Sequence, residues 1–237
     1  MRCLVIDRSS IRPGMAVFDG EALVCEQVWD GEPTRSPEWM AWLAEALASQ
    51  GLSVPDLDAF LCGLGPGSFS GIRAALSALQ GMALPGSRPV YGVASAAALA
   101  LGHADGAADV TVVGDARRNR LWCVTYRVDA TDCRVRLLGG RVPAHTSDDF
   151  RLVPAEALTQ TVPDGTRILT TDWDRLSGVL TSTFAAERLV AHAVFPRAVD
   201  VGRLALSEPQ ARVLEPLPVY LHPAVAEKEN QAVRLLC

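Results

Sequence analysis

Short apolar runs separated by turn residues recur along the chain and predict alternating strands and helices. The runs Cys3–Ile6, Met15–Phe18 and Leu23–Val28 predict a three-stranded meander, with Asp19-Gly20 as the hairpin turn before its last strand. From Trp39 to Gln50 the apolar residues recur at helical spacing, which predicts a helix. The first part of the chain therefore begins with antiparallel strands and continues into a helix.

A second series of the same kind begins near residue 110. It predicts strands at Val110–Val113, Leu121–Tyr126 and Val135–Leu138, again read as strand, hairpin and strand. Two segments that each start with a meander and continue into α/β units predict an α/β fold with mixed sheets. The other predicted elements are strands at Asp58–Gly63, Val90–Val93 and Arg167–Thr170 and helices at Ile72–Ala83, Ser95–Leu101, Asp174–Thr183 and Val199–Ser207.

The segment His103–Ala108, rich in Gly and Ala, is the best candidate boundary between two lobes. We expect an N-terminal lobe at residues 1–105 and a smaller C-terminal lobe at residues 106–237. The last predicted helix could instead pack back on the first lobe.

Composition places the chain among ordinary globular proteins, because 49% of its 237 residues are hydrophobic and 21% are charged. No apolar run approaches the roughly 18–20 residues of a membrane helix. The first apolar run stops at Asp7 and Arg8, unlike a signal peptide. Six cysteines without a CxxC pair indicate reduced thiols. We therefore expect a cytoplasmic protein that does not associate with membranes.

Charge narrows the chemistry further. Lys and Arg number 22 and Asp and Glu 27, so the formal net charge is −5. The one lysine, Lys228, lies in a polar segment near the end and is unsuited to a P-loop or a Schiff base. An acidic chain is also a poor non-specific binder of nucleic acid, because neutralised phosphates supply most of that affinity. If RNA is involved, a partner is expected to supply most of the positive surface.

A glycine-rich turn between a predicted strand and helix is the most informative segment. It lacks the Gly-Lys-Ser/Thr of a P-loop, the third glycine of a dinucleotide fingerprint and the central serine of a nucleophile elbow. Two interpretations stay open: a tight turn capped by Ser68 or Ser70 with Phe69 as an apolar anchor, or an anion site at the helix N-terminus. The turn consists of Gly65, Pro66, Gly67, Ser68, Phe69, Ser70 and Gly71.

This turn, continued by Ile72-Arg73, resembles the signature GPGSFTG[LVI]R of the TsaB (YeaZ) family. Three weaker similarities follow the family's order along the chain: Leu4–Asp7, Asp115-Ala116-Arg117 and Pro218–Leu221. The chain departs from the family pattern at Arg8-Ser9-Ser10, where a threonine usually follows the aspartate, at Ser70 in place of threonine, and at Arg120 in place of a frequent glutamate.

The resemblance implies an actin-like two-lobe fold of the kinase–actin–Hsp70 superfamily. It also implies a role in making threonylcarbamoyladenosine (t6A) on tRNA, as a non-catalytic subunit that binds and activates the catalytic subunit TsaD. The ATPase TsaE would join the complex, and TsaC would supply the threonylcarbamoyl-adenylate. We expect no cofactor on this chain, with ATP or ADP and metal on the partners, tRNA contact only through the complex, and a homodimer when the chain is alone.

In the family, the helix after the turn and the helix before it form the surface for self-association and for pairing with TsaD. Small residues four apart on the first of these, such as Ala74 and Ala78, favour close approach of another helix. Carried over, the resemblance nominates Trp39, Trp42, Leu43, Arg73, Leu76, Leu79, Gln80 and Ala83 as partner-surface residues.

The predicted hairpin near residue 118 is a candidate contact for tRNA or a partner. Arg117, Arg118 and Arg120 cluster there, with Trp122 and Tyr126 nearby. The competing interpretation is a solvated hairpin tip.

Enzyme alternatives are an actin-like ATPase or a glycoprotease-type metallopeptidase acting alone, and a structural homodimer is a third class. A helical metal site needs two histidines four apart, but none of the four histidines lies within five residues of another. We expect each histidine at the surface or capping a helix. Asp7 would be the phosphate-end carboxylate of an actin-like ATPase, although the flanking Arg8 argues against an intact nucleotide site.

Overall fold

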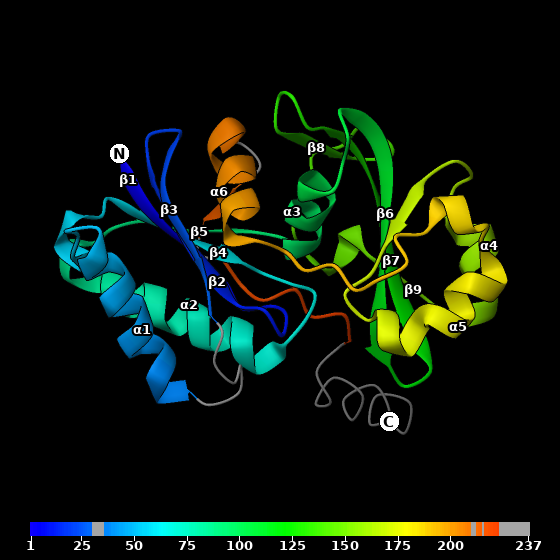
Figure 1. Ribbon diagram of the computed structural model, residues 1–237, viewed down its shortest axis with the longest axis horizontal. Coiled ribbons are helices and arrows are strands. Elements are labelled where there is room, and N and C mark those ends of the chain that lie inside the picture. Colours follow the sequence, from blue (N-terminus) through cyan, green and yellow to red (C-terminus); the bar gives the residue numbers. More distant parts are fainter. Residues whose placement is uncertain (30–35, 210–211, 215, 223–237) are drawn as a thin grey trace, which may run out of the picture.

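The computed structural model describes residues 1–29, 36–209, 212–214 and 216–222. Two β-sheets lie side by side, and helices α3 (Ser95–Gly102) and α6 (Ala198–Ser207) occupy the space between them (Figure 1).

The first sheet has six strands in the order β11-β5-β4-β1-β2-β3. The meander predicted at the N-terminus is confirmed, because β1 pairs antiparallel with β2 and β2 pairs antiparallel with β3. On the other side, β4 runs parallel to β1 and β5 parallel to β4, which gives the predicted mixed sheet. The strands are β1 (Arg2–Asp7), β2 (Gly14–Asp19), β3 (Ala22–Val28), β4 (Ala59–Gly63), β5 (Val90–Val93) and β11 (Val213–Leu214).

Helices cover both faces of this sheet. Helix α6 packs against β1, β2 and β4, while α2 (Phe69–Ala83) packs against β4 and β1 from the opposite face (Figure 1). Helix α1 (Ser36–Ser49) lies beside α2. It begins three residues before the predicted run Trp39–Gln50 and ends one residue before the end of that run.

The second sheet is built around a long hairpin, β6 (Ala107–Arg117) and β7 (Arg120–Asp129). Its strand order is β10-β6-β7-β8, and β9 also pairs with β7. The remaining elements are β8 (Arg134–Leu137), β9 (Arg151–Val153), β10 (Arg167–Leu169), α4 (Leu158–Thr161) and α5 (Trp173–Thr183), with 3-10 turns at Val54–Asp56, Leu84–Gly86, Ser147–Asp149, Ala155–Ala157 and Ala186–Arg188.

Alternation along β7 divides the hydrophobic core. Trp122 and Val124 face the main core cluster, which continues through α3 and α6 into the first sheet. Leu121 and Cys123 face a second cluster, which α4 and α5 cover. The two lobes thus share one continuous core along the helices between them.

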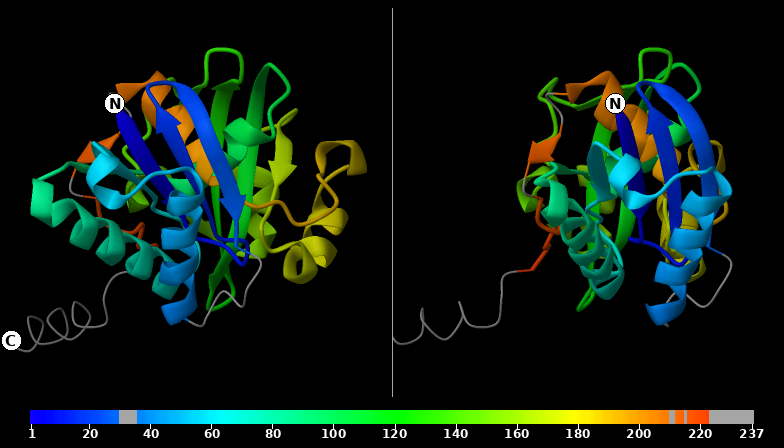
Figure 2. Two further views of the ribbon diagram at one scale, coloured as in Figure 1. Left: turned by 60° about the vertical axis from the view of Figure 1, so that its left-hand side comes forward. Right: turned by 90° about the vertical axis from the view of Figure 1, so that its left-hand side faces the viewer.

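C-terminal elements return to the first lobe. Helix α6 packs on the first sheet, and β11 extends that sheet as an edge strand beside β5. A division at residue 105 therefore does not assign every element to its lobe. Figure 2 shows α6, in orange, beside the N-terminal strands, in blue.

Candidate functional site

Asp7 ends strand β1 inside the protein. Its Oδ1 accepts hydrogen bonds from the Ser9 amide (2.8 Å) and the Ser9 hydroxyl (2.7 Å), and its Oδ2 accepts one from the Ser95 hydroxyl (2.6 Å). Burial raises the pKa of the carboxyl above its ordinary value, against the opposing effect of these hydrogen bonds. Asp7 is therefore held by its own chain, as a strand-end aspartate satisfied by its neighbours would be.

The glycine-rich turn packs directly on the loop after β1. The Ser68 amide donates to the Ser9 carbonyl oxygen at 2.7 Å. A Cβ on Gly67 would lie 2.1 Å from that same oxygen, and a Cβ on Gly71 would lie 2.2 Å from the Arg8 carbonyl oxygen. These glycines permit backbone to approach backbone, which supports the structural interpretation of the turn over an anion site.

Ser68 caps helix α2, as one interpretation of the turn predicted. Its hydroxyl accepts from the Gly71 amide at 3.3 Å, so the helix starts at Phe69, three residues before the predicted start. The expectation that Phe69 is an apolar anchor is wrong, because 53% of its surface is exposed. Its ring lies 5.5 Å from that of Tyr220, and the Arg73 guanidinium lies 5.1 Å from the centre of the Phe69 ring.

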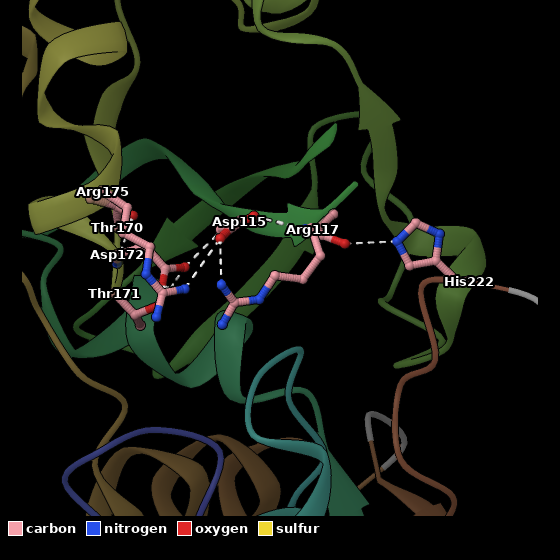
Figure 3. A network of polar contacts seen from close by, with 8 residues as sticks. Asp115, Arg117, Thr170, Thr171, Asp172, Arg175 and His222 are labelled. Carbon is pink, nitrogen blue, oxygen red and sulfur yellow. Dashed lines mark hydrogen bonds and ion pairs between the residues drawn. The ribbon is translucent and has the colours of Figure 1, made fainter. Parts of the chain in front are cut away.

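Residues Pro216–His222 form a C-terminal strap that runs from the first sheet to the β6–β7 hairpin. The Val219 amide donates to the Leu64 carbonyl oxygen at 3.0 Å, next to the glycine-rich turn. Farther along, His222 Nε2 donates to the Ala116 carbonyl oxygen at 2.7 Å (Figure 3). The strap thereby connects two of the segments that resemble the family, Asp115–Arg117 and the turn.

Asp115 organises the base of the hairpin tip. Its Oδ2 pairs with the guanidinium groups of Arg117 and Arg175, each at 3.1 Å, and its Oδ1 accepts from the Arg117 amide at 2.7 Å (Figure 3). The Asp115 amide donates to Asp172 Oδ2 at 3.0 Å. Helix α5 and the hairpin are thus joined through two carboxylates, those of Asp115 and Asp172.

The tip itself has an unusual backbone. Arg117, Arg118 and Asn119 are all left-handed, with φ of 64°, 52° and 55°. Positive φ at both central residues of a two-residue loop is the geometry of a type I′ hairpin, here built without glycine. The tip arginines are exposed, as expected, and Arg120 Nη2 donates to the Leu152 carbonyl oxygen at 2.9 Å.

The aromatic residues expected beside these arginines are not there. Trp122 and Tyr126 are both buried, because their positions on β7 alternate toward the main core. The proposal that they form a basic and aromatic patch with Arg117 is therefore wrong.

The residues nominated as a partner surface divide by exposure. Arg73 and Gln80 are exposed on α2, and Trp42 is half-buried on α1. The other nominated residues lie in the main core, because the apolar stripe of each helix faces the chain's own sheet. The expectation that they face a partner is therefore wrong. These residues are Trp39, Leu43, Leu76, Leu79 and Ala83.

The outward face of α2 consists instead of small and polar residues followed by an exposed leucine. Ser77, Gln80 and Gly81 share this face with Arg73, and Leu84 follows just beyond the helix. A Cβ on Gly81 would meet no atom within 4 Å.

Histidines and acidic residues do not gather into a metal site in the part of the chain that the structure describes. His145 is buried, contrary to a surface position, and its Nδ1 accepts from the Ala94 amide just before α3 at 3.1 Å. Among the described helices, none combines the length and apolar character needed to cross a bilayer.

Two site features escaped the sequence reasoning. Ser95 donates to the Asp7 carboxylate although the two residues are 88 positions apart in the sequence. Tyr220 belongs to the segment Pro218–Leu221, which has only a weak similarity to the family, and His222 follows that segment. The one available signal for the strap was the position of these polar and aromatic residues just after Pro218-Val219.

Comparison with known proteins agrees with this fold and these motifs. The family model "TsaD: tRNA N6-adenosine threonylcarbamoyltransferase" matches residues 36–137. "tRNA threonylcarbamoyladenosine biosynthesis protein TsaB" of Escherichia coli (strain K12) is 30% identical over 54% of this chain. The solved structure "YeaZ from Pseudomonas aeruginosa" matches with a TM-score of 0.72 and 25% identity, covering 93% of this chain and 99% of that one.

A second relative, "Uncharacterized protein Rv3421c" of Mycobacterium tuberculosis, is 41% identical over 34% of this chain. The chain spans 56% of the length of the E. coli relative and 37% of the mycobacterial one. The structural match extends over nearly the whole chain and confirms the expected α/β, actin-like two-lobe fold with mixed sheets. In its signature turn, its curated relatives and its fold, this chain is similar to the TsaB/YeaZ proteins.

Proposed function

We propose that this chain is a non-catalytic subunit that binds and activates the catalytic subunit TsaD, in forming t6A at the adenosine beside the anticodon of tRNA. The name of the E. coli relative supports a role in t6A biosynthesis, and the TsaD family model that matches residues 36–137 supports common ancestry with the catalytic subunit. The protein would act in the cytoplasm.

The observation that carries the non-catalytic role is the internal engagement of Asp7. An actin-like ATPase needs its strand-end carboxylate available to a metal or a phosphate-bound water. Here both carboxylate oxygens are taken by Ser9 and Ser95, and the loop at Arg8-Ser9 fills the space against the glycine-rich turn. ATP or ADP and metal would therefore be held by the partners, with TsaE as the ATPase of the complex.

The outward face of α2 is the proposed docking surface. Ser77 and Gly81 carry little side-chain bulk, so a helix of TsaD can approach closely, and exposed Leu84 offers apolar contact. The same face would support a homodimer when the chain is alone. Activation then means that the contact energy favours the active conformation of TsaD, while tRNA is bound by the assembled complex.

The test is reconstitution of the modification reaction. Purified TsaD, TsaE, the threonylcarbamoyl-adenylate-forming enzyme and unmodified tRNA are combined with and without this chain, and t6A is quantified by mass spectrometry of digested tRNA. We expect at least a tenfold lower rate without the chain, since the catalytic subunit then lacks its activating contact.

Equal t6A formation with and without the chain would overturn the proposal. So would ATP or peptide hydrolysis by the purified chain alone, because it would favour the alternatives of a stand-alone actin-like ATPase or a metallopeptidase. The Asp7→Asn variant is the control for such hydrolysis, since only a true ATPase would lose its activity.

A further inference from the structure

We propose that the exposed surface shared by the glycine-rich turn, the C-terminal strap and the β6–β7 hairpin tip is a contact site for a single-stranded segment of RNA. This inference rests on the proposed function, because that function brings an RNA substrate to the complex. It assigns to this chain a direct part in holding that RNA.

Three segments far apart in the sequence meet at this surface. Phe69 at the start of α2 contacts Tyr220 of the strap, with ring centres 5.5 Å apart. Two residues later, His222 is hydrogen-bonded to Ala116 at the base of the hairpin tip (Figure 3). A stretch of three strap residues thus connects an aromatic pair to an arginine-rich tip.

The aromatic pair is exposed without a reason in folding. Phe69 is 53% and Tyr220 45% exposed, although buried packing is the usual position of such rings. The Arg73 guanidinium lies over the Phe69 ring, and no acidic side chain in the described part of the chain pairs with it. Exposed rings beside arginine are the platform on which unpaired bases stack.

The hairpin tip adds positive charge that the described residues do not neutralise. Asp115 pairs with Arg117 and Arg175, so these two arginines mainly fix the tip. Arg120 donates only to a backbone carbonyl, and Arg118 has no hydrogen bond or ion pair to any residue that the structure describes. The left-handed backbone at Arg118 holds its side chain at the end of the hairpin, where a phosphate can reach it.

An acidic protein surface would also pair with the arginines. Its carboxylates would not stack on the exposed rings of Phe69 and Tyr220. RNA supplies phosphates for the arginines and bases for the rings. The net charge of −5 is compatible with this assignment, because a local patch in an acidic chain supplies a small part of the RNA affinity and its partners supply the rest.

The experiment measures binding of a fluorescent RNA stem-loop with an unpaired loop to the complex of this chain with TsaD, at several salt concentrations. Arg118→Ala should lower the slope of log affinity against log salt by about 0.7, because one phosphate contact is lost. Phe69→Ala should weaken binding by about 5- to 100-fold without changing the slope, because it removes stacking and no charge.

Arg134→Ala is the matched control. Arg134 is an exposed arginine that pairs with Asp132 near the other end of β7, about 30 Å from the tip by strand length. This variant should bind RNA as the wild type does. Circular dichroism melting of each variant verifies that it is folded.

Wild-type affinity and salt slope in both Arg118→Ala and Phe69→Ala would overturn the inference. Loss of TsaD association in these variants, with RNA binding retained, would overturn it in favour of an acidic protein partner. Sedimentation of the same samples separates this inference from the proposed function. If the wild-type chain does not associate with TsaD, the proposed function fails. RNA binding by the chain alone at low salt then decides the inference.

Discussion

At the scale of single residues, the signature turn is determined by close backbone contact. Gly71 lies within helix α2, yet a Cβ there would approach the Arg8 carbonyl oxygen to 2.2 Å. This nearest atom belongs to the backbone, so it cannot move aside as the end of a flexible side chain could. The glycine therefore fixes how the loop after β1 packs on the turn, and through that loop it fixes the position of Asp7.

Gly71→Ala should lower the free energy of unfolding by about 1–3 kcal/mol, because the overpacking outweighs the helix propensity gained. Gly178→Ala in α5 is the matched control, since its Cβ would meet no atom within 4 Å. That variant should gain about 0.5–1 kcal/mol. Chemical denaturation measures the free energy of unfolding of both variants. Equal stability of the two would contradict the close contact between the turn and the loop after β1.

At the scale of elements, the C-terminal strap is the feature that the sequence patterns left out. It has neither helical nor strand periodicity, and its order comes from contacts with Leu64, Phe69 and Ala116, which are far away in the chain. Its residues Pro216, Pro218 and Val219 are buried against the first lobe. The strap therefore helps to hold the turn and the hairpin in one arrangement.

A chain that ends at Glu215 should lose roughly 2–4 kcal/mol of unfolding free energy, from the buried side chains and the backbone hydrogen bond of Val219. A chain that ends at His222 keeps every strap contact that the structure describes and serves as the control. Thermal melting compares the two. A melting temperature that is the same for both chains would contradict a stabilising role for the strap.

The strands and helices themselves could be predicted because their signals are local. A short apolar run predicted β7, helical spacing predicted α1, and the Asp19-Gly20 pair predicted the first hairpin. The direction in which α2 faces could not be predicted, because both of its faces have low polarity and only packing shows that Leu76 and Leu79 meet the sheet. The bond between Ser95 and Asp7 likewise depends on the closed fold and not on sequence spacing.

At the scale of the whole molecule, α6 connects the two sheets. Arg197 at its start pairs with Glu26 of β3 at 2.5 Å, and Glu208 just after its end pairs with Arg136 of β8. Together with the continuous core around α3, these contacts make the lobes one frame. That frame presents the outward face of α2 on one lobe, while the other lobe carries the hairpin tip.

The central claim is that this outward face binds the catalytic subunit, and Gly81→Arg tests it most directly. Gly81 and Gly178 are both exposed helical glycines with open space around a new Cβ, so arginine should leave the fold intact in each variant. In sedimentation velocity of equimolar mixtures with TsaD, we predict that the wild type and Gly178→Arg sediment as a complex while Gly81→Arg sediments as separate subunits. A complex of unchanged size and affinity with Gly81→Arg would contradict the account.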